Sequence, residues 1–268
     1  MDIKKYGFAI IAVIFSVIVT GIVVIHYSKK NMDLPQLLND GRLYVLTDSS
    51  SLGFCQQSGK VCGFQYEIAK AFADTLGVEL VISKEEDFDK CVDLIKNGDY
   101  HIIANMIPTT IEREHDLSFT IPFQHARLML VQATSQDSTA NNLIHTYDEL
   151  NKDTIYVTAH SPHIFRLKNL SNEIAQSFTI LEDQSSSIEQ LIEKVSQYKI
   201  KMTVCDEISA KAFKRKYPNI DVSLPLGFSQ PMSWAVNSKS NLLRKELNDF
   251  IEDYINSPAY WELYRRYH

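Results

Sequence analysis

The sequence has little cysteine and glycine, and it lacks an excess of positive charge. Its 268 residues include four cysteines and nine glycines, and 27 lysine and arginine residues are set against 33 aspartate and glutamate residues, for a net charge of −6. Without a basic field to hold a polyanion, we expect no nucleic-acid partner. The cysteines form no CxxC pair, so the usual spacing of a zinc site is also missing.

The common catalytic and nucleotide-binding motifs are absent as well. There is no GxxxxGK[ST] loop, no GxGxxG, no GxSxG and no HExxH. His160 and His163 have a spacing found in metal sites, but they flank a proline at a predicted helix start and have no third ligand. We therefore expect no metal, no cofactor and no catalytic residue.

One long uncharged run lies near the N-terminus. Residues 8–25 read FAIIAVIFSVIVTGIVVI, and as a helix they would be about 27 Å long, close to the hydrocarbon thickness of a bilayer. A cleaved signal peptide is the alternative, although its apolar region is usually shorter and ends in small residues. We expect residues 1–30 to form a transmembrane anchor or an uncleaved signal. Lysines on both flanks leave its orientation open.

Predicted strands and helices alternate through the rest of the chain. The first series has strands at 42–47, 78–83 and 101–106 and helices at 63–77 and 88–98. The second has strands at 154–159, 177–181, 201–206 and 220–224 and helices at 162–174, 185–198 and 207–218. This order is typical of α/β sheets with parallel strands.

The two successive α/β series predict two lobes. A strand at 231–237 and a helix remain after the second series, and if they return to the first lobe the chain crosses between the lobes twice. We expect lobe 1 to contain residues 41–133 and 229–268, and lobe 2 to contain residues 134–228. Ligands favour the cleft between such lobes, and the crossings would act as a hinge.

A short hairpin is predicted around GFCQQSGKVCGF. If Ser58 and Gly59 centre the turn, Cys55 and Cys62 lie directly opposite each other, within reach of a disulfide. A bridge there would indicate an oxidising compartment. The alternative is two small apolar residues in a strand pair.

Three segments resemble the family 3 extracellular solute-binding proteins: GKVCGFQYEIAKAFADTLGVEL, PTTIEREHDLSFTIPF and KMTVCDEISAKAF. The resemblance covers residues 41–267 and implies a bilobed fold of the periplasmic-binding-protein type II, exported from the cytoplasm. Within that class the chain is most similar to the non-catalytic N-terminal module of membrane-bound lytic murein transglycosylase F. The resemblance to that module does not carry over the enzyme's activity.

The resemblance also implies two ligand-binding residues. Arg113 matches an arginine that binds the ligand's α-carboxylate, a role that suits a planar guanidinium with two parallel donors. Asp206 matches an aspartate that binds the α-ammonium group. The alternatives are a surface ion pair for Arg113 and a helix N-cap for Asp206.

Other positions depart from the family pattern. Pro108 stands where a serine or threonine supports the carboxylate, and Thr109 is the candidate substitute. Ser161 is a candidate donor from the second lobe, although Pro162 beside it removes one amide. Asp48 and Phe54 are candidates for a charged and an apolar contact on the first lobe. These differences favour a peptide, a cell-wall fragment or weak binding over a free amino acid.

Three functions follow as hypotheses. The first is a membrane-anchored binding protein outside the cytoplasm that closes on an amino-acid-like or peptide-like ligand without changing it. The second is a regulatory or vestigial module of a lytic transglycosylase system. The third is an enzyme like cyclohexadienyl dehydratase on the same scaffold, which needs a general acid in the cleft.

Overall fold

The structure is a computed structural model that describes residue 16 and residues 33–57, 59–110, 113–134, 143–175 and 177–268. Apart from residue 16, the apolar run at 8–25 lies outside the described residues. Within the described part of the chain, no helix has both the length and the apolar character needed to cross a membrane.

The first lobe is built on a six-stranded sheet in the order β4-β1-β5-β13-β6, with β7 paired to β13. Strand β1 pairs in parallel with both β4 and β5, which confirms the βαβαβ pattern. Strand β13 runs antiparallel to β5, β6 and β7. The bounds are α2 (Leu34–Asp40), β1 (Arg42–Thr47), α3 (Phe64–Leu76), β4 (Glu79–Lys84), α4 (Phe88–Asn97), β5 (Ile102–Pro108), β6 (Leu117–Phe119), β7 (Gln124–Ala126) and β13 (Gln230–Asn237).

The second lobe is built on a five-stranded sheet in the order β10-β9-β11-β8-β12. Strands β10, β9 and β11 are parallel, and β8 is antiparallel to both β11 and β12. The bounds are β8 (Leu128–Ala133), the 3-10 helix η2 (Tyr147–Leu150), β9 (Thr154–Thr158), α5 (Ile164–Glu173), β10 (Thr179–Asp183), α6 (Ile188–Ser196), β11 (Met202–Asp206), α7 (Glu207–Lys216) and β12 (Ile220–Asp221).

One part of the predicted division needs correction. Residues 128–133 were assigned to lobe 1, but they form β8, which is hydrogen-bonded along its length to β11 in the second sheet. The first crossing therefore lies at Arg127, between β7 and β8. The second crossing lies between Leu226, whose amide donates to Leu128, and the start of β13 at Gln230.

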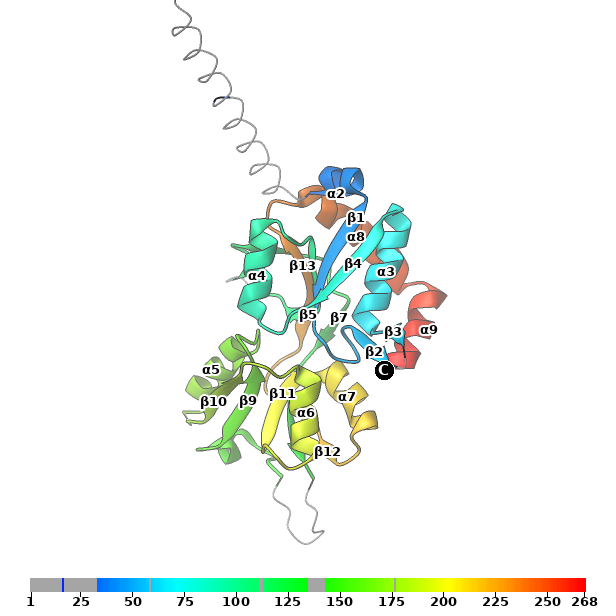
Figure 1. Cartoon of the computed structure of the whole chain (residues 1–268). Helices are drawn as coiled ribbons and strands as arrows, with labels where there is room; N and C mark the ends of the chain where they lie inside the picture. Colours follow the sequence, from blue (N-terminus) through cyan, green and yellow to red (C-terminus); the bar gives the residue numbers. More distant parts are fainter. Residues whose placement is uncertain (1–15, 17–32, 58, 111–112, 135–142, 176) are drawn as a thin grey trace, which may run out of the picture.

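The end of the chain returns to the first lobe, as the leftover strand and helix predicted. Helix α8 (Asn241–Ile255) contacts α2 and α9 (Pro258–Tyr267), and α9 packs beside α3. In Figure 1 the first lobe is above, with α4 on one side of its sheet and α3 and α9 on the other, and the second lobe is below.

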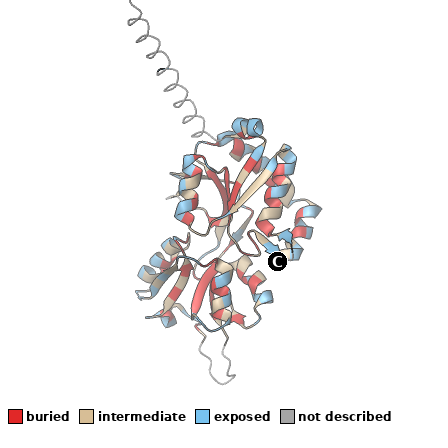
Figure 2. Cartoon of the chain, viewed as in Figure 1, coloured by how far each residue is buried: buried red, intermediate tan, exposed pale blue. Residues whose placement is uncertain are grey.

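The described residues form three apolar core clusters: one lies in each lobe, and the third contains residues of both lobes. The predicted inner face of α3 is buried at Ile68 and Phe72, and Trp234 of β13 is fully buried, as a packing role requires. The second lobe buries β8, β9 and β11 (Figure 2). The two lobes are joined by only two short crossings, and the interface between them is the expected place for a site.

Candidate functional site

A cavity of about 110 Å³ lies between the lobes. The first lobe contributes residues that follow β1 and β4, including Asp48 and Glu86, and the second contributes Ser161 after β9 and Asp206 at the end of β11. These positions are the carboxyl ends of parallel strands, where ligands bind in open α/β sheets. The fold therefore brings the strand ends of the two lobes to one shared cavity.

Carboxyl groups dominate the charge of this cavity. Asp48, Glu85, Glu86 and Asp206 line it, and none of the described residues that line it is a lysine or arginine. His163 also lines it, but burial, together with the charge of Arg113, lowers the pKa of its imidazole to about 4. At neutral pH the cavity therefore contains acidic groups and a neutral histidine.

On the first lobe, two acidic side chains are held by the loop that follows β1. Oδ1 of Asp48 accepts a hydrogen bond from the amide of Ser50 at 2.8 Å, and Oε1 of Glu86 accepts one from the amide of Ser49 at 2.8 Å. Burial raises the pKa of Asp48. Burial, and then the nearby charge of Asp48, raises the pKa of Glu86.

On the second lobe, Asp206 is buried and caps helix α7. Its Oδ1 accepts hydrogen bonds from the amides of Ile208 and Ser209, each at 3.0 Å, and its Oδ2 accepts one from the Ser209 hydroxyl. Burial raises the pKa of Asp206 in spite of these donors. The N-cap role is therefore present, and the side chain also faces the cavity. Its contact with a ligand stays a prediction.

Arg113 lies in a neighbouring groove of about 390 Å³ and not among the residues that line the cavity. Its Nη1 donates to the carbonyl of Pro108 at 2.9 Å, and its Nη2 donates to the carbonyl of Pro162 in the other lobe at 2.5 Å. Its guanidinium carbon lies 5.2 Å from the centre of the Phe88 ring. Arg113 thus ties the lobes together, and its role as a carboxylate ligand stays a prediction.

The cavity and the groove share two residues, Phe88 and Ser161. The structure brings Asp48, Ser161 and Asp206 to the cavity and leaves Arg113 on the other side of this boundary. Thr109 does not line the cavity either, and its hydroxyl lies 3.3 Å from that of Ser233.

Phe54 does not form the expected wall of the cavity. Its ring packs against Tyr66 with centroids 5.3 Å apart, and Lys84 lies over it. Phe88 and Phe213 line the cavity instead, and sequence reasoning missed Phe88 together with Glu86. A signal was available, since both belong to the acidic segment EEDF directly after β4, at the carboxyl end of a strand.

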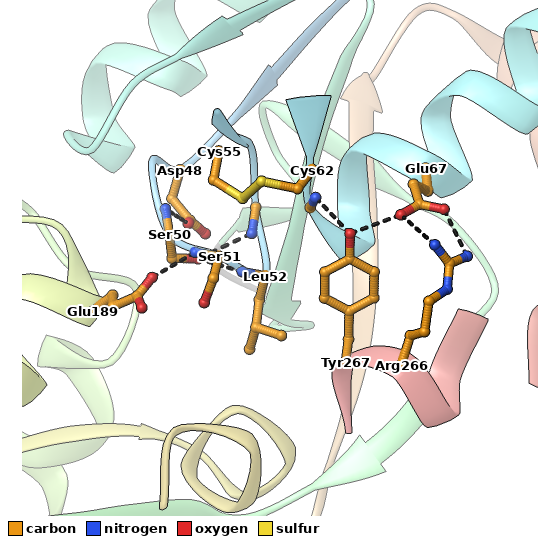
Figure 3. Close-up of a disulfide and its surroundings, with 12 residues drawn as sticks. Asp48, Ser50, Ser51, Leu52, Cys55, Cys62, Glu67, Glu189, Arg266 and Tyr267 are labelled. Carbon is orange, nitrogen blue, oxygen red and sulfur yellow. Dashed lines mark hydrogen bonds and ion pairs between the residues drawn. A yellow bond between two sulfur atoms is a disulfide. The ribbon is translucent and has the colours of Figure 1, made fainter. Parts of the chain in front are cut away.

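The loop that carries Asp48 continues into the predicted disulfide hairpin (Figure 3). Strands β2 (Cys55–Gln57) and β3 (Lys60–Cys62) pair with Cys55 opposite Cys62, and the two sulfurs are bonded, as predicted. Gly63 follows with φ of 136°, and a side chain there would meet the carbonyl of Gly53. The hairpin therefore fixes the loop beside the cavity.

Helix α9 holds the base of this hairpin. The hydroxyl of Tyr267 accepts from the amide of Gly63 at 2.8 Å and donates to Glu67 at 2.7 Å, and Arg266 pairs with Glu67 (Figure 3). Glu67 is thus a structural residue away from the cavity. In the same view, the amide of Ser51 donates across the lobes to Glu189 of α6 at 2.5 Å.

Two α/β lobes, two crossings and a cavity at the strand ends define a bilobed solute-binding protein. The family model of the bacterial extracellular solute-binding proteins, family 3, matches residues 42–268, and the chain belongs to this family.

Curated relatives carry the name membrane-bound lytic murein transglycosylase F. The chain is 29% identical over 242 residues to the one from Desulfosudis oleivorans, covering 90% of this chain and 52% of that protein. For the one from Alcanivorax borkumensis the identity is 27%, with 78% and 43% covered. The chain thus spans about half the length of the curated relatives that it matches.

Solved structures share the fold at lower identity. An ancestral arginine-binding protein bound to arginine has a TM-score of 0.70 and 20% identity, covering 85% of this chain and 98% of its own. A substrate-binding protein of an amino acid ABC transporter from Streptococcus pneumoniae, bound to L-arginine, has a TM-score of 0.72 and 20% identity, with 87% and 97% covered. An ancestral amino-acid-binding protein described as a precursor of cyclohexadienyl dehydratase has a TM-score of 0.72 and 18% identity, with 87% and 98% covered.

Proposed function

We propose that the protein is a solute-binding protein of the cell envelope that closes on a small, positively charged, amino-acid-like ligand without changing it covalently. The observation that supports this most strongly is the lining of the cavity. Asp48, Glu86 and Asp206 approach it from both lobes, and the described residues that line it include no lysine or arginine to balance them. The ligand is expected to supply the missing positive charge.

The raised pKa values give this proposal its physical basis. Burial makes the charged form of a carboxyl group costly, and nearby carboxylates add repulsion. An ammonium or guanidinium group within hydrogen-bond distance would reverse both effects, because a buried charge is stable when it is paired. Since Asp48 and Asp206 belong to different lobes, a cation between them would also favour the closed state.

The comparisons support the ligand class without fixing it. Two solved relatives of the same fold are described as bound to arginine. A single amino acid also suits the small cavity better than the muropeptide or longer peptide that the altered sequence motifs suggested.

Thermal shift measurements on the full chain test the proposal. The panel is L-arginine and L-lysine, with L-citrulline as a neutral match for arginine and L-glutamate as an acidic amino acid. A ligand at one hundred times its Kd stabilises by roughly 2.7 kcal/mol, so a true ligand should raise Tm clearly. We expect shifts with arginine or lysine alone, and shifts with glutamate alone would refute the cation-binding proposal.

Agmatine has the guanidinium group of arginine but lacks its carboxylate. It therefore separates the predicted contact of Arg113 with the ligand's carboxylate from the contact of the cavity's acidic residues with the ligand's positive charge. If Arg113 binds the carboxylate, agmatine should bind much more weakly than arginine, and the difference should disappear in Arg113→Ala. If Arg113 only joins the lobes, agmatine and arginine should lose affinity equally in that variant.

Residues 1–30 are proposed to anchor the protein in the cytoplasmic membrane with the body outside. The length of the apolar run and the family's extracellular character support this. Membrane fractionation with protease added from outside provides the test. We expect the full chain in the membrane fraction and digestible from outside, and a chain lacking residues 1–30 in the soluble fraction.

A dehydratase is the second candidate, because a carboxyl group with a raised pKa can act as a general acid. Glu86 and Asp48 are better placed than Asp206, since each accepts one backbone amide whereas Asp206 caps a helix through two. Incubation with cyclohexadienyl acids and detection of the aromatic product tests this activity. A chain that neither shifts with any ligand nor forms product would favour the remaining hypothesis, a regulatory or vestigial module of a lytic transglycosylase system.

A further inference from the structure

The two lobes touch each other at places outside the cavity. At one of them, the start of α4 meets the turn between β9 and α5. The amide of Phe88 donates to the carbonyl of Ala159 at 3.4 Å, and Nδ1 of His160 lies 2.9 Å from Oδ1 of Asp87. This His160–Asp87 contact joins two side chains that can titrate or carry charge, and no function assigned above uses it.

Each partner of this contact is positioned by its own lobe. Asp87 is the N-cap of α4, where its Oδ1 accepts from the amide of Lys90 at 3.1 Å. His160 has φ of 47°, and its amide donates to Glu182 at 2.7 Å, which fixes the turn after β9. The backbone on both sides of the contact is therefore held within its own lobe, which places the two side chains opposite each other when the lobes close.

We propose that His160 and Asp87 form a pH-sensitive latch, in which protonation of His160 stabilises the closed arrangement of the lobes. Protonated histidine donates from both ring nitrogens and carries a positive charge, so it forms an ion pair with Asp87. Neutral histidine keeps at most a hydrogen bond.

The charges around His160 support a preference for its protonated form. Carboxylates approach from both lobes, with Asp87 and Asp89 on α4 and Glu182 on β10. The groove also contains Arg113, Asp116 and Lys168, of which Asp116 is paired with Lys96 at 3.0 Å. Arg113 is directed at the carbonyls of Pro108 and Pro162.

The sign of the effect follows from linkage. The hydrogen bond to Asp87 raises the pKa of His160 above its usual value of about 6.5 when the lobes are closed. The closed state therefore binds the proton more tightly than an open state, in which the pair is broken. The latch therefore stabilises the closed arrangement fully at a pH below the usual histidine pKa. This stabilisation is lost as the pH rises through the raised pKa of His160 in the closed state.

The effect should be modest because the pair is partly exposed, with 46% of the His160 side chain and 28% of the Asp87 side chain open to solvent. Exposed ion pairs change an equilibrium by about two- to fivefold. High salt should reduce the effect further.

Distance measurement between the lobes tests the latch without any ligand. Spin or dye labels at Asp93→Cys on α4 and Asn172→Cys on α5 occupy exposed positions on either side of it. In the full chain, we expect the ratio of closed to open molecules to rise two- to fivefold from pH 8.5 to pH 5.5. His160→Gln should remove this pH response, and so should Asp87→Asn, which preserves the helix cap.

His115→Gln provides the matched control. His115 is also exposed and lies 3.1 Å from an aspartate, but that partner, Asp116, belongs to its own lobe. This variant should respond to pH like the unchanged protein. A protein with no pH response would overturn the proposal, as would a response that survives in His160→Gln or disappears in His115→Gln. Since no ligand is added, failure here leaves the cation-binding proposal untouched.

Discussion

The cavity and the groove beside it share Phe88 and Ser161, but the charged side chains of the two sites differ in the partners that they have within the protein. In the cavity, Asp48, Glu86 and Asp206 lie together without a basic partner among the residues that line it. In the groove, Arg113 donates to two carbonyls and His160 contacts Asp87, so these two basic side chains have partners within the protein.

This difference separates two tasks. Unbalanced carboxyl groups lower the stability of the empty protein and so favour a ligand that balances them, which is typical of a recognition site. Paired groups that cross between lobes stabilise the closed arrangement whether or not a ligand is present. We therefore propose that the cavity serves ligand recognition and that contacts in the groove help to hold the lobes closed.

Removal of one cavity carboxylate should have the largest effect. Asp206→Asn keeps the Oδ1 acceptor that caps α7, yet it removes the charge that we propose a cationic ligand contacts. Loss of one partner from a buried charge pair should weaken arginine or lysine binding by about 30-fold or more, as calorimetry would measure. Asp221→Asn, in the same lobe but outside the cavity, should bind normally. Equal losses in both variants would contradict a specific role for Asp206.

Loss of the disulfide beside the cavity should lower the stability of the protein but leave the His160–Asp87 latch in the groove unchanged. In the chain-entropy model, a bridge that closes so short a loop contributes about 2.5 kcal/mol. The double variant Cys55→Ser, Cys62→Ser should lower the free energy of unfolding by roughly that amount in urea titrations. Its pH response between the lobes should persist, because the latch does not contact the hairpin. Gln56→Ser, on the same exposed hairpin, is the control for stability.

Asp48→Asn should stabilise the empty protein at neutral pH while it weakens binding. Burial raises the pKa of Asp48, so the folded state binds its proton more tightly than the unfolded state. The wild-type protein therefore loses stability as the pH rises from about 3.9 through that raised value. Calorimetry without ligand should show a higher Tm for the variant at pH 7.5, and a smaller gain or none at pH 4.5. A lower Tm at pH 7.5 would mean that Asp48 is already balanced by a protein group.

The smallest effect is expected at the first crossing. Arg127 forms two hydrogen bonds with Glu207 at 2.8 and 2.9 Å, and this pairing, with Lys211, lowers the pKa of Glu207 to about 2. Because the arginine is exposed, Glu207→Gln should cost only about 0.5–1 kcal/mol at neutral pH. The Arg127–Glu207 pair stabilises the folded protein at a pH above the usual glutamate pKa. This stabilisation is lost as the pH falls towards about 2, where Glu207 becomes protonated. In denaturant titrations, Glu207→Gln should therefore lower the free energy of unfolding more at pH 7 than at pH 3.

Most of the fold was predictable because its elements are long and clearly patterned. Helix α3 has its apolar residues on one face, and α6 begins with a serine that forms a capping box. Strand β8 was misplaced because the apolar segment from 128 to 133 follows Ala126 and Arg127 with no glycine or proline to mark the crossing. Strands β6 and β7, of three residues each, are too short for a periodic pattern.

The site was predictable only in part, for a related reason. Asp206 stands where a predicted strand becomes a helix, a position that sequence alone can identify. Glu86 and Phe88 lie in the acidic segment EEDF, whose composition is typical of an exposed loop. Only the position of the second lobe makes this segment part of the cavity. The contacts of Arg113 depend on Pro162, about fifty residues away in the other lobe, and no local pattern encodes that approach.

The most direct test of the cation-binding site is calorimetric titration of the full chain with L-arginine and then with L-citrulline. The two molecules have nearly the same shape, and only arginine carries a charged side chain. We predict that arginine binds measurably and that citrulline binds at least about 30-fold more weakly, since it cannot balance the buried carboxylates. Equal binding of both, or preferential binding of citrulline, would contradict the account.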